Sequence, residues 1–138
     1  MRELITESAL KTEQAGIWLA GLVKGGDIIA YKGGLGMGKT TFTRGLAEGL
    51  GITEQVSSPT FTLINEYRGD KNRLCHVDAY RLTGGDDLVD TGFFDYVDSG
   101  WIAAVEWSEM VELEADFTVS FERIDDNTRR ITIEGRGV

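Results

Sequence analysis

A glycine-rich segment carries the clearest chemical signal in this sequence. Residues 33–40 read Gly-Gly-Leu-Gly-Met-Gly-Lys-Thr and fit the pattern G-x-x-x-x-G-K-[ST] in full. In a phosphate-binding loop of this kind, the glycines let backbone N–H groups converge on phosphate oxygens. The Lys39 ammonium would contact the β- and γ-phosphates, and the Thr40 hydroxyl would bind Mg²⁺. The alternative is a glycine-rich turn that matches by chance.

The elements on either side of this segment decide between these interpretations. Residues 27–31 form a short apolar run that predicts a buried strand, and residues 39–50 predict a helix that ends at Gly51. A strand-loop-helix context is what a phosphate loop requires, because the helix directs its positive end at the anion. The pattern therefore predicts a nucleotide site formed by Gly33, Gly36, Met37, Gly38, Lys39, Thr40 and Thr41.

Two further apolar runs end in a carboxylate, Asp78 and Glu106. Hydrolysis at a phosphate loop needs one acidic group for the metal and another group to position the attacking water. Either carboxylate could instead be a solvated residue at a strand end. We predict that Glu106 binds Mg²⁺ together with Thr40, because its strand is more continuously apolar and therefore more central. Asp78 is then expected near the hydrolytic water.

Two other polar features are ambiguous. Residues 56–63 read Val-Ser-Ser-Pro-Thr-Phe-Thr-Leu and follow the predicted loop helix. Their hydroxyl groups could sense the γ-phosphate, or the segment could be a polar turn stiffened by Pro59. His76, the single histidine, is expected to be a structural residue in the middle of a strand. One histidine beside Cys75 does not make a zinc site.

The remaining elements alternate between helices and strands. Residues 8–24 predict a helix capped by Ser8, and residues 86–90 predict a short helix that stops at Gly92. Residues 101–105 predict a buried strand. Two hairpins are expected, from residues 60–67 with 73–80 and from residues 117–124 with 129–134. This order indicates a single three-layer α/β domain over residues 1–138, with a mixed sheet of the P-loop NTPase type.

Composition narrows the class of protein. The chain has 138 residues, with 23 acidic and 14 basic side chains, which gives a formal net charge of −9. This balance argues against direct binding to DNA or to a membrane surface, since both need a basic face. Cys75 has no partner for an intrachain disulfide, and the N-terminus shows no signal-like pattern. We therefore expect a cytoplasmic protein.

Four motifs together resemble the bacterial TsaE family. They are the loop sequence 34–41, Ser-Pro-Thr-Phe-Thr-Leu at 58–63, His-Val-Asp-Ala-Tyr-Arg-Leu at 76–82 and Glu-Trp at 106–107. The resemblance implies an ATPase that acts with the TsaD and TsaB proteins. That pair transfers threonylcarbamoyl to the adenosine next to the anticodon of certain tRNAs. It also implies that ATP and Mg²⁺ are cofactors, and that tRNA is contacted only through the TsaD–TsaB complex.

The same resemblance assigns roles to individual residues. The family residues that match Thr40 and Glu106 bind Mg²⁺, and those that match Thr60, Asp78 and Trp107 are implicated in activity. This sequence has Gly34 and Met37 where Asp and Ala are usual in the family, and neither change removes a phosphate donor. The C-terminal third matches weakly. It leaves open whether Arg129 or Arg130 reaches the site.

A phosphate loop is also compatible with functions other than ATP hydrolysis. A small-molecule kinase needs an acceptor pocket and usually a basic lid, whereas the residues after Asp86 are acidic. A GTPase is disfavoured because the guanine-reading pattern N-K-x-D is absent from the sequence. A scaffold that binds the nucleotide without hydrolysing it is compatible with every motif above. The kinase and the scaffold are the alternatives to an ATPase.

Overall fold

The computed structural model describes residues 1–33, 38–57, 64–79, 85–106 and 113–138, with the backbone alone for residues 85–87. Its strands form one seven-stranded sheet in the order β1-β7-β6-β2-β5-β4-β3. Strands β6, β2, β5 and β4 run parallel, while β3, β7 and β1 pair antiparallel with their neighbours. The mixed sheet is thus confirmed. The strands are β1 Arg2–Thr6, β2 Ile28–Lys32, β3 Ile64–Arg68, β4 Arg73–Asp78, β5 Ile102–Glu106, β6 Phe117–Arg123 and β7 Arg129–Gly135.

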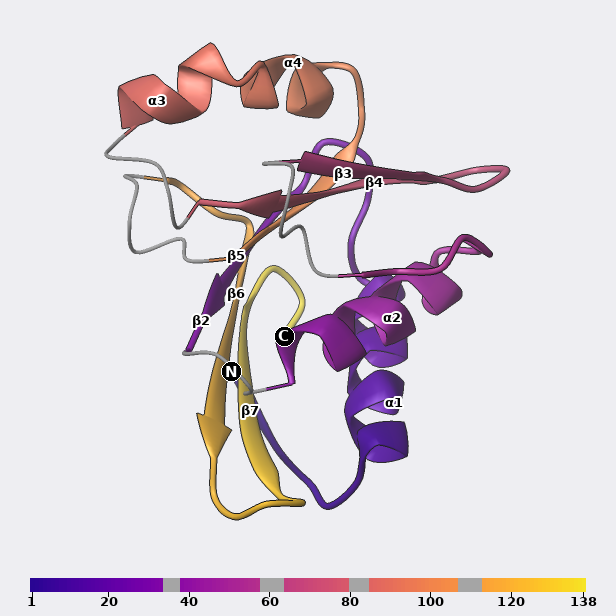
Figure 1. Ribbon diagram of the computed structural model, residues 1–138, viewed down its shortest axis with the longest axis vertical. Helices are drawn as coiled ribbons and strands as arrows, with labels where there is room; N and C mark the ends of the chain where they lie inside the picture. Colours follow the sequence, from indigo (N-terminus) through magenta and orange to yellow (C-terminus); the bar gives the residue numbers. More distant parts are fainter. Residues whose placement is uncertain (34–37, 58–63, 80–84, 107–112) are drawn as a thin grey trace.

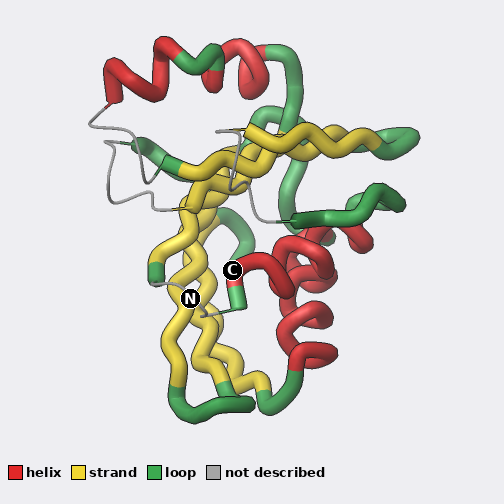
Figure 2. Tube along the Cα trace, in the orientation of Figure 1, coloured by secondary structure: helices red, strands yellow, loops and turns green. Residues whose placement is uncertain are grey.

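Helices lie on both faces of the sheet, as Figures 1 and 2 show. Helices α1 (Ala9–Ala20) and α2 (Lys39–Gly49) pack on one face, and the short helices α3 (Gly85–Asp90) and α4 (Phe93–Asp98) pack on the other. The buried side chains accordingly form two clusters. Leu19, Phe42 and Leu46 belong to the first cluster, and Leu88 and Phe93 to the second. The three-layer arrangement agrees with the prediction.

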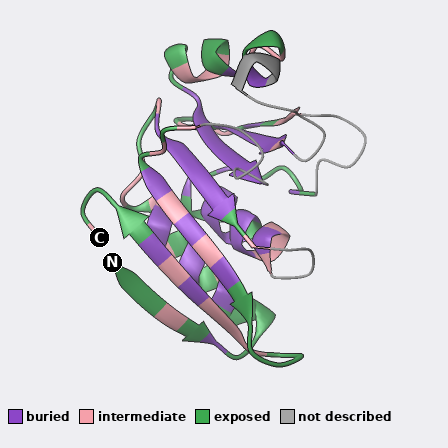
Figure 3. Cartoon of the chain, turned by 90° about the vertical axis from the view of Figure 1, so that its left-hand side faces the viewer, coloured by how far each residue is buried: buried purple, intermediate pink, exposed green. Residues whose placement is uncertain are grey.

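The two predicted hairpins are present. Strands β3 and β4 are joined by a turn in which the Gly69 amide donates to the Asn72 carbonyl at 2.8 Å. Strands β6 and β7 pair antiparallel from Phe117 with Gly135 to Arg123 with Arg129. Residues 60–63 and Tyr80, which the prediction included in the first hairpin, lie outside the described residues. In Figure 3, buried and half-buried residues alternate along β6 and β7.

Helix α1 begins where predicted but ends earlier. The Ser8 side chain caps it by accepting a hydrogen bond from the Lys11 amide at 3.2 Å. The predicted end at residue 24 was wrong, because the amides of Gly21 and Leu22 bond to carbonyls only three residues back. The Lys24 amide donates instead to the Asp27 carboxylate at 2.9 Å. No described helix is long and apolar enough to cross a membrane.

Two elements were not predicted. Strand β1 forms an edge of the sheet by pairing with β7, and only its last residue, Thr6, is buried. Helix α4 begins directly after Gly92, which the sequence analysis interpreted only as a helix stop. Gly92 adopts φ +82° and is the N-cap of α4, so it ends one short helix and starts the next.

Candidate nucleotide site

The site is built on the carboxyl ends of three adjacent parallel strands. Strand β5 lies between β2 and β4, and every residue of β5 is buried. Asp78 and Glu106 are the last residues of β4 and β5, and they face each other in register. The structure therefore brings the two predicted carboxylates together, next to the strand that leads into the glycine-rich loop. It also confirms that the strand of Glu106 is central.

Both described ends of the glycine-rich loop require glycine. Gly33 has φ +136°, and a Cβ atom there would lie 2.7 Å from the Phe121 carbonyl oxygen. Gly38 has φ +96° and is the N-cap of α2. A side chain at either position would strain the backbone. Residues 34–37, which include the predicted Gly36 and Met37, lie outside the described residues.

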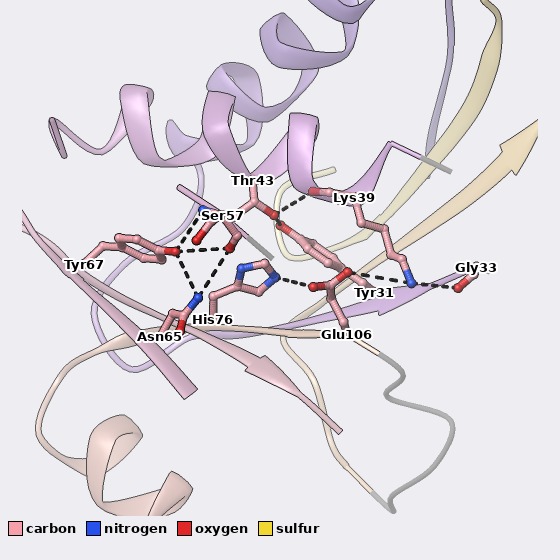
Figure 4. Close-up of polar contacts among 9 residues, drawn as sticks. All are labelled: Tyr31, Gly33, Lys39, Thr43, Ser57, Asn65, Tyr67, His76 and Glu106. Atoms are coloured by element: carbon pink, nitrogen blue, oxygen red, sulfur yellow. Dashed lines mark hydrogen bonds and ion pairs between the residues drawn. The ribbon is translucent and has the colours of Figure 1, made fainter. Parts of the chain in front are cut away.

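Lys39 places its charge between the loop and the carboxylate. Its side chain is 5% exposed, and its Nζ atom donates a hydrogen bond to the Gly33 carbonyl at 2.9 Å. The same Nζ lies 3.8 Å from Oε1 of Glu106 (Figure 4). Thr40 and Thr41 follow in the first turn of α2 and are half-buried. This turn therefore carries a buried cation and two hydroxyl groups at the mouth of the loop.

A buried chain of hydrogen bonds fixes this first turn to strand β2. The Tyr31 hydroxyl lies 2.8 Å from Thr43 Oγ1, and Thr43 Oγ1 donates to the Lys39 carbonyl at 2.7 Å. Burial raises the pKa of the Tyr31 hydroxyl far above its usual value, against the hydrogen bond with Thr43, so the hydroxyl stays protonated. The Tyr31 ring also meets the edges or faces of Phe42 and Phe121 in T-shaped contacts.

His76 belongs to the site through a contact that was not predicted from the sequence. It is fully buried, and its Nε2 atom lies 2.7 Å from Oε2 of Glu106. Figure 4 shows the imidazole and Lys39 on opposite sides of this carboxylate. Burial tends to raise the pKa of Glu106, but the contact with His76 and the charge of Lys39 outweigh it and hold this pKa below its usual value. Glu106 is therefore an ionised carboxylate in a nearly dry site.

A sequence signal for this contact does exist. His76 is two residues before Asp78, so both side chains leave the same face of a strand. If Asp78 and Glu106 end neighbouring parallel strands, then His76 must also lie on the face that carries Glu106. The observed register has His76 beside Ala104 and Asp78 beside Glu106. The missing step was the pairing of the two strands.

The oxygen atoms of Glu106 fit a divalent cation whose other ligands are phosphate oxygens and waters. Among the described residues, no group of three or more His, Cys, Asp or Glu side chains could hold a metal ion. Mg²⁺ prefers oxygen ligands and is usually held by one or two carboxylates together with phosphate oxygens and waters. An ionised Glu106 beside the lysine of the glycine-rich loop matches that chemistry.

A pocket of about 200 Å³ opens beside the start of α2. It lies between the N-terminus of α1, the first turn of α2 and the turn that joins β6 to β7. Arg129 contributes to its wall, whereas Arg130 pairs with Glu122 at 3.0 Å. Of the two arginines left open by the sequence, Arg129 is thus the one that faces this pocket. The lining residues are Ser8, Ala9, Thr12, Gly38, Thr41, Asp126, Asn127 and Arg129.

Thr60 and Trp107, two further predicted site residues, lie outside the described residues. Ser57, which directly precedes residues 58–63, is hydrogen-bonded to residues of β3. The Ser57 amide donates to the Tyr67 hydroxyl at 3.1 Å, and this hydroxyl donates to the Ser57 carbonyl at 3.2 Å. The Asn65 side chain also donates to both groups, at 3.4 Å to the Ser57 carbonyl and 3.3 Å to the Tyr67 hydroxyl. The chain is thus tied to β3 just before residue 58.

The sheet order and the loop between β2 and α2 define a three-layer α/β domain of the P-loop NTPase type. The family model "Threonylcarbamoyl adenosine biosynthesis protein TsaE" matches residues 6–131, and the chain belongs to this TsaE family. The relative from Bacillus subtilis, named "tRNA threonylcarbamoyladenosine biosynthesis protein TsaE", is 40% identical over 121 residues, which cover 86% of this chain and 75% of the relative. The relative of the same name from Aquifex aeolicus is 38% identical over 135 residues, which cover 96% of each chain.

A solved structure agrees with this assignment. The crystal structure of Bacillus subtilis YdiB superposes with a TM-score of 0.78 at 34% sequence identity, covering 99% of this chain and 86% of that chain. The resemblance inferred from the four motifs is therefore confirmed at the level of family and fold.

Proposed function

We propose that this protein binds and hydrolyses ATP with Mg²⁺, and that it acts with the TsaD–TsaB complex in the threonylcarbamoyl modification of tRNA adenosine. The observation that carries the nucleotide part is the position of Lys39, whose Nζ lies within 2.9 Å of the Gly33 carbonyl and 3.8 Å from Glu106. The loop lysine and the acidic strand end are thus already assembled around one point. Membership of the TsaE family supports the tRNA part.

The residues have distinct roles in this proposal. Lys39 contacts the β- and γ-phosphates, and the backbone N–H groups at the start of α2 face the same anion. Thr40 and Glu106 would hold Mg²⁺, which would supply positive charge against the negative charge that develops during phosphoryl transfer. Asp78 orients the attacking water. The pocket beside Gly38 and Thr41 takes the base and ribose, because it adjoins the loop that takes the phosphates.

The primary test is ATP hydrolysis by the pure protein, alone and with TsaD–TsaB. We expect slow hydrolysis alone, faster hydrolysis with the partner complex, and dependence on Mg²⁺ in both cases. A kinase would transfer phosphate to a small acceptor in preference to water, and a scaffold would bind ATP without turnover in either assay. Either result would replace the ATPase proposal.

The partner assignment has a test of its own. With a net charge of −9, the chain is unfavourable for binding tRNA on its own, so we expect the complex to supply most of the tRNA contact. A nucleotide shifts docking only if the docked and free forms bind it differently. Sedimentation with TsaD–TsaB under ATP, ADP and no nucleotide should therefore give unequal association. Equal association, or tight tRNA binding by the isolated chain, would contradict this part. We place the protein in the cytoplasm, where the single thiol of Cys75 stays reduced.

A further inference from the structure

The contact between His76 and Glu106 goes beyond the roles assigned so far. His76 is fully buried in the middle of β4, and Glu106 is 6% exposed at the end of β5. Burying a carboxylate or an imidazole is unfavourable unless each finds a polar partner. Here they find each other at 2.7 Å, between Nε2 of the ring and Oε2 of the carboxylate. Packing alone would not require a polar ring at this position.

The local register explains how the ring reaches the carboxylate. His76 stands beside Ala104 on the neighbouring strand, and Asp78 stands beside Glu106. Because the Ala104 side chain is a single methyl group, it leaves room for the imidazole to extend along the strands toward Glu106. The Tyr31 ring, on β2, packs against the imidazole with ring centroids 6.3 Å apart. The imidazole thus contacts Tyr31 and, through its Nε2 atom, Glu106.

The two oxygens of the carboxylate have different neighbours. Oε2 faces His76, whereas Oε1 faces Lys39 at 3.8 Å. The ring nitrogen Nε2 lies 2.7 Å from the carboxylate, and neither Nε2 nor Nδ1 makes a hydrogen bond of regular geometry among the described residues. A neutral ring with its proton on Nε2 can donate to the carboxylate. Its Nδ1 atom then carries no proton, so no buried N–H group is left without an acceptor.

We propose that His76 is a positioning residue for Mg²⁺ binding, which donates from Nε2 to Oε2 of Glu106 and thereby presents Oε1 to the ligand at the loop. This inference rests on the proposed function, in which Glu106 holds the metal. Hydrogen-bonded partners of metal ligands fix ligand orientation, and their removal typically weakens metal affinity by about 10–100-fold. His76 itself touches neither nucleotide nor metal in this scheme.

The geometry distinguishes between replacements. In His76→Gln, the side-chain amide can donate from close to the position of Nε2. In His76→Asn, the amide is one methylene shorter and falls near Nδ1, and His76→Leu removes the donor altogether. Cys75→Ala is a matched control, because Cys75 is equally buried on the same strand but faces the opposite side of the sheet.

Calorimetric titration with ADP at graded Mg²⁺ concentrations provides the functional readout. For the asparagine and leucine variants, we expect the Mg²⁺ concentration needed for half-maximal tightening of ADP binding to rise about 10–100-fold. The glutamine variant and Cys75→Ala should stay close to the wild type. ADP affinity without Mg²⁺ should be unchanged in all of them. The inference fails if the leucine variant keeps the wild-type Mg²⁺ dependence, or if glutamine behaves like leucine.

A second measurement uses the wild-type protein, so it does not depend on whether any variant folds. His76 is the only histidine in the chain, so the ring nitrogens of the nucleotide-free protein give one set of NMR signals. A proton on Nε2, in either a neutral or a charged ring, supports the inference, and a bare Nε2 overturns it. If wild-type protein shows no Mg²⁺-dependent nucleotide binding, the proposed function fails instead, and the ring signals still report on the contact.

Discussion

Replacing Lys39 with methionine removes the ammonium from the site while keeping most of the buried aliphatic stem. At 3.8 Å from Glu106, the charge is worth roughly 4 kcal/mol at an effective dielectric constant of about 20, before the opposing cost of desolvating the ammonium. Because His76 still contacts the carboxylate, we expect less destabilisation than the about 3–5 kcal/mol seen when a buried ion loses its partner entirely. The variant should therefore remain folded.

Nucleotide binding should respond far more strongly. A hydrogen bond from a charged donor contributes about 1.5–3 kcal/mol, so losing contacts with two phosphates weakens ATP binding by roughly 10²–10⁴-fold. Calorimetric titration with ATP and Mg²⁺ measures this loss, and NMR titration of Glu106 should show a raised pKa because one source of positive charge is gone. Lys32→Met is the matched control, since Lys32 is exposed at the end of β2 and changes the net charge equally. Unchanged ATP affinity in folded Lys39→Met protein would refute the phosphate-site assignment.

Three further predictions concern the carboxylates and the loop. Glu106→Gln should mainly weaken the Mg²⁺ dependence of ATP binding, whereas Asp78→Asn should preserve binding and lower turnover on the order of 10²-fold. The reverse pattern in metal titrations and turnover assays would show that the roles are exchanged. The lowered pKa of Glu106 contributes stability that is complete above its usual value of 4.5 and is lost as the pH falls through the folded value, so urea unfolding of Glu106→Gln should show a flatter acid limb than the wild type. Gly33→Ala should lower the free energy of unfolding by about 1–3 kcal/mol, through backbone strain and the clash with the Phe121 carbonyl. The effect should exceed that of Gly51→Ala, because Gly51 also has a positive φ but a Cβ atom there would meet nothing within 4 Å. Equal thermal melting of the two variants would contradict this explanation.

Local patterns were sufficient to predict the central part of the fold. The loop, its strand and its helix are contiguous in sequence, and each has a clear signal in hydrophobic pattern or glycine placement. Asp78 and Glu106 could each be identified because each ends an apolar run, whereas the side-by-side position of their strand ends became known only from the structure. The Ser8 cap was also predictable from the local sequence, since its partner Lys11 is only three residues away.

Features that depend on distant partners were not predictable in this way. Strand β1 has mostly exposed residues and exists because it pairs with β7 at the other end of the chain, from Arg2 with Ile133 to Thr6 with Arg129. His76 was correctly expected in the middle of a strand, but its contact with Glu106 depends on the register of β4 and β5, which are separated in sequence by α3 and α4. Neither fact is encoded within a short window of residues.

The hydrogen bonds from Tyr31 through Thr43 to the Lys39 carbonyl bear on the entropy of ligand binding. They join the end of β2 to the start of α2, so both ends of the glycine-rich loop are ordered when the domain folds. Their conformational freedom is lost at that stage, and a phosphate group that binds later does not have to restrict it again. Under the proposed function, selection for tight phosphate binding would therefore also act on buried residues such as Thr43.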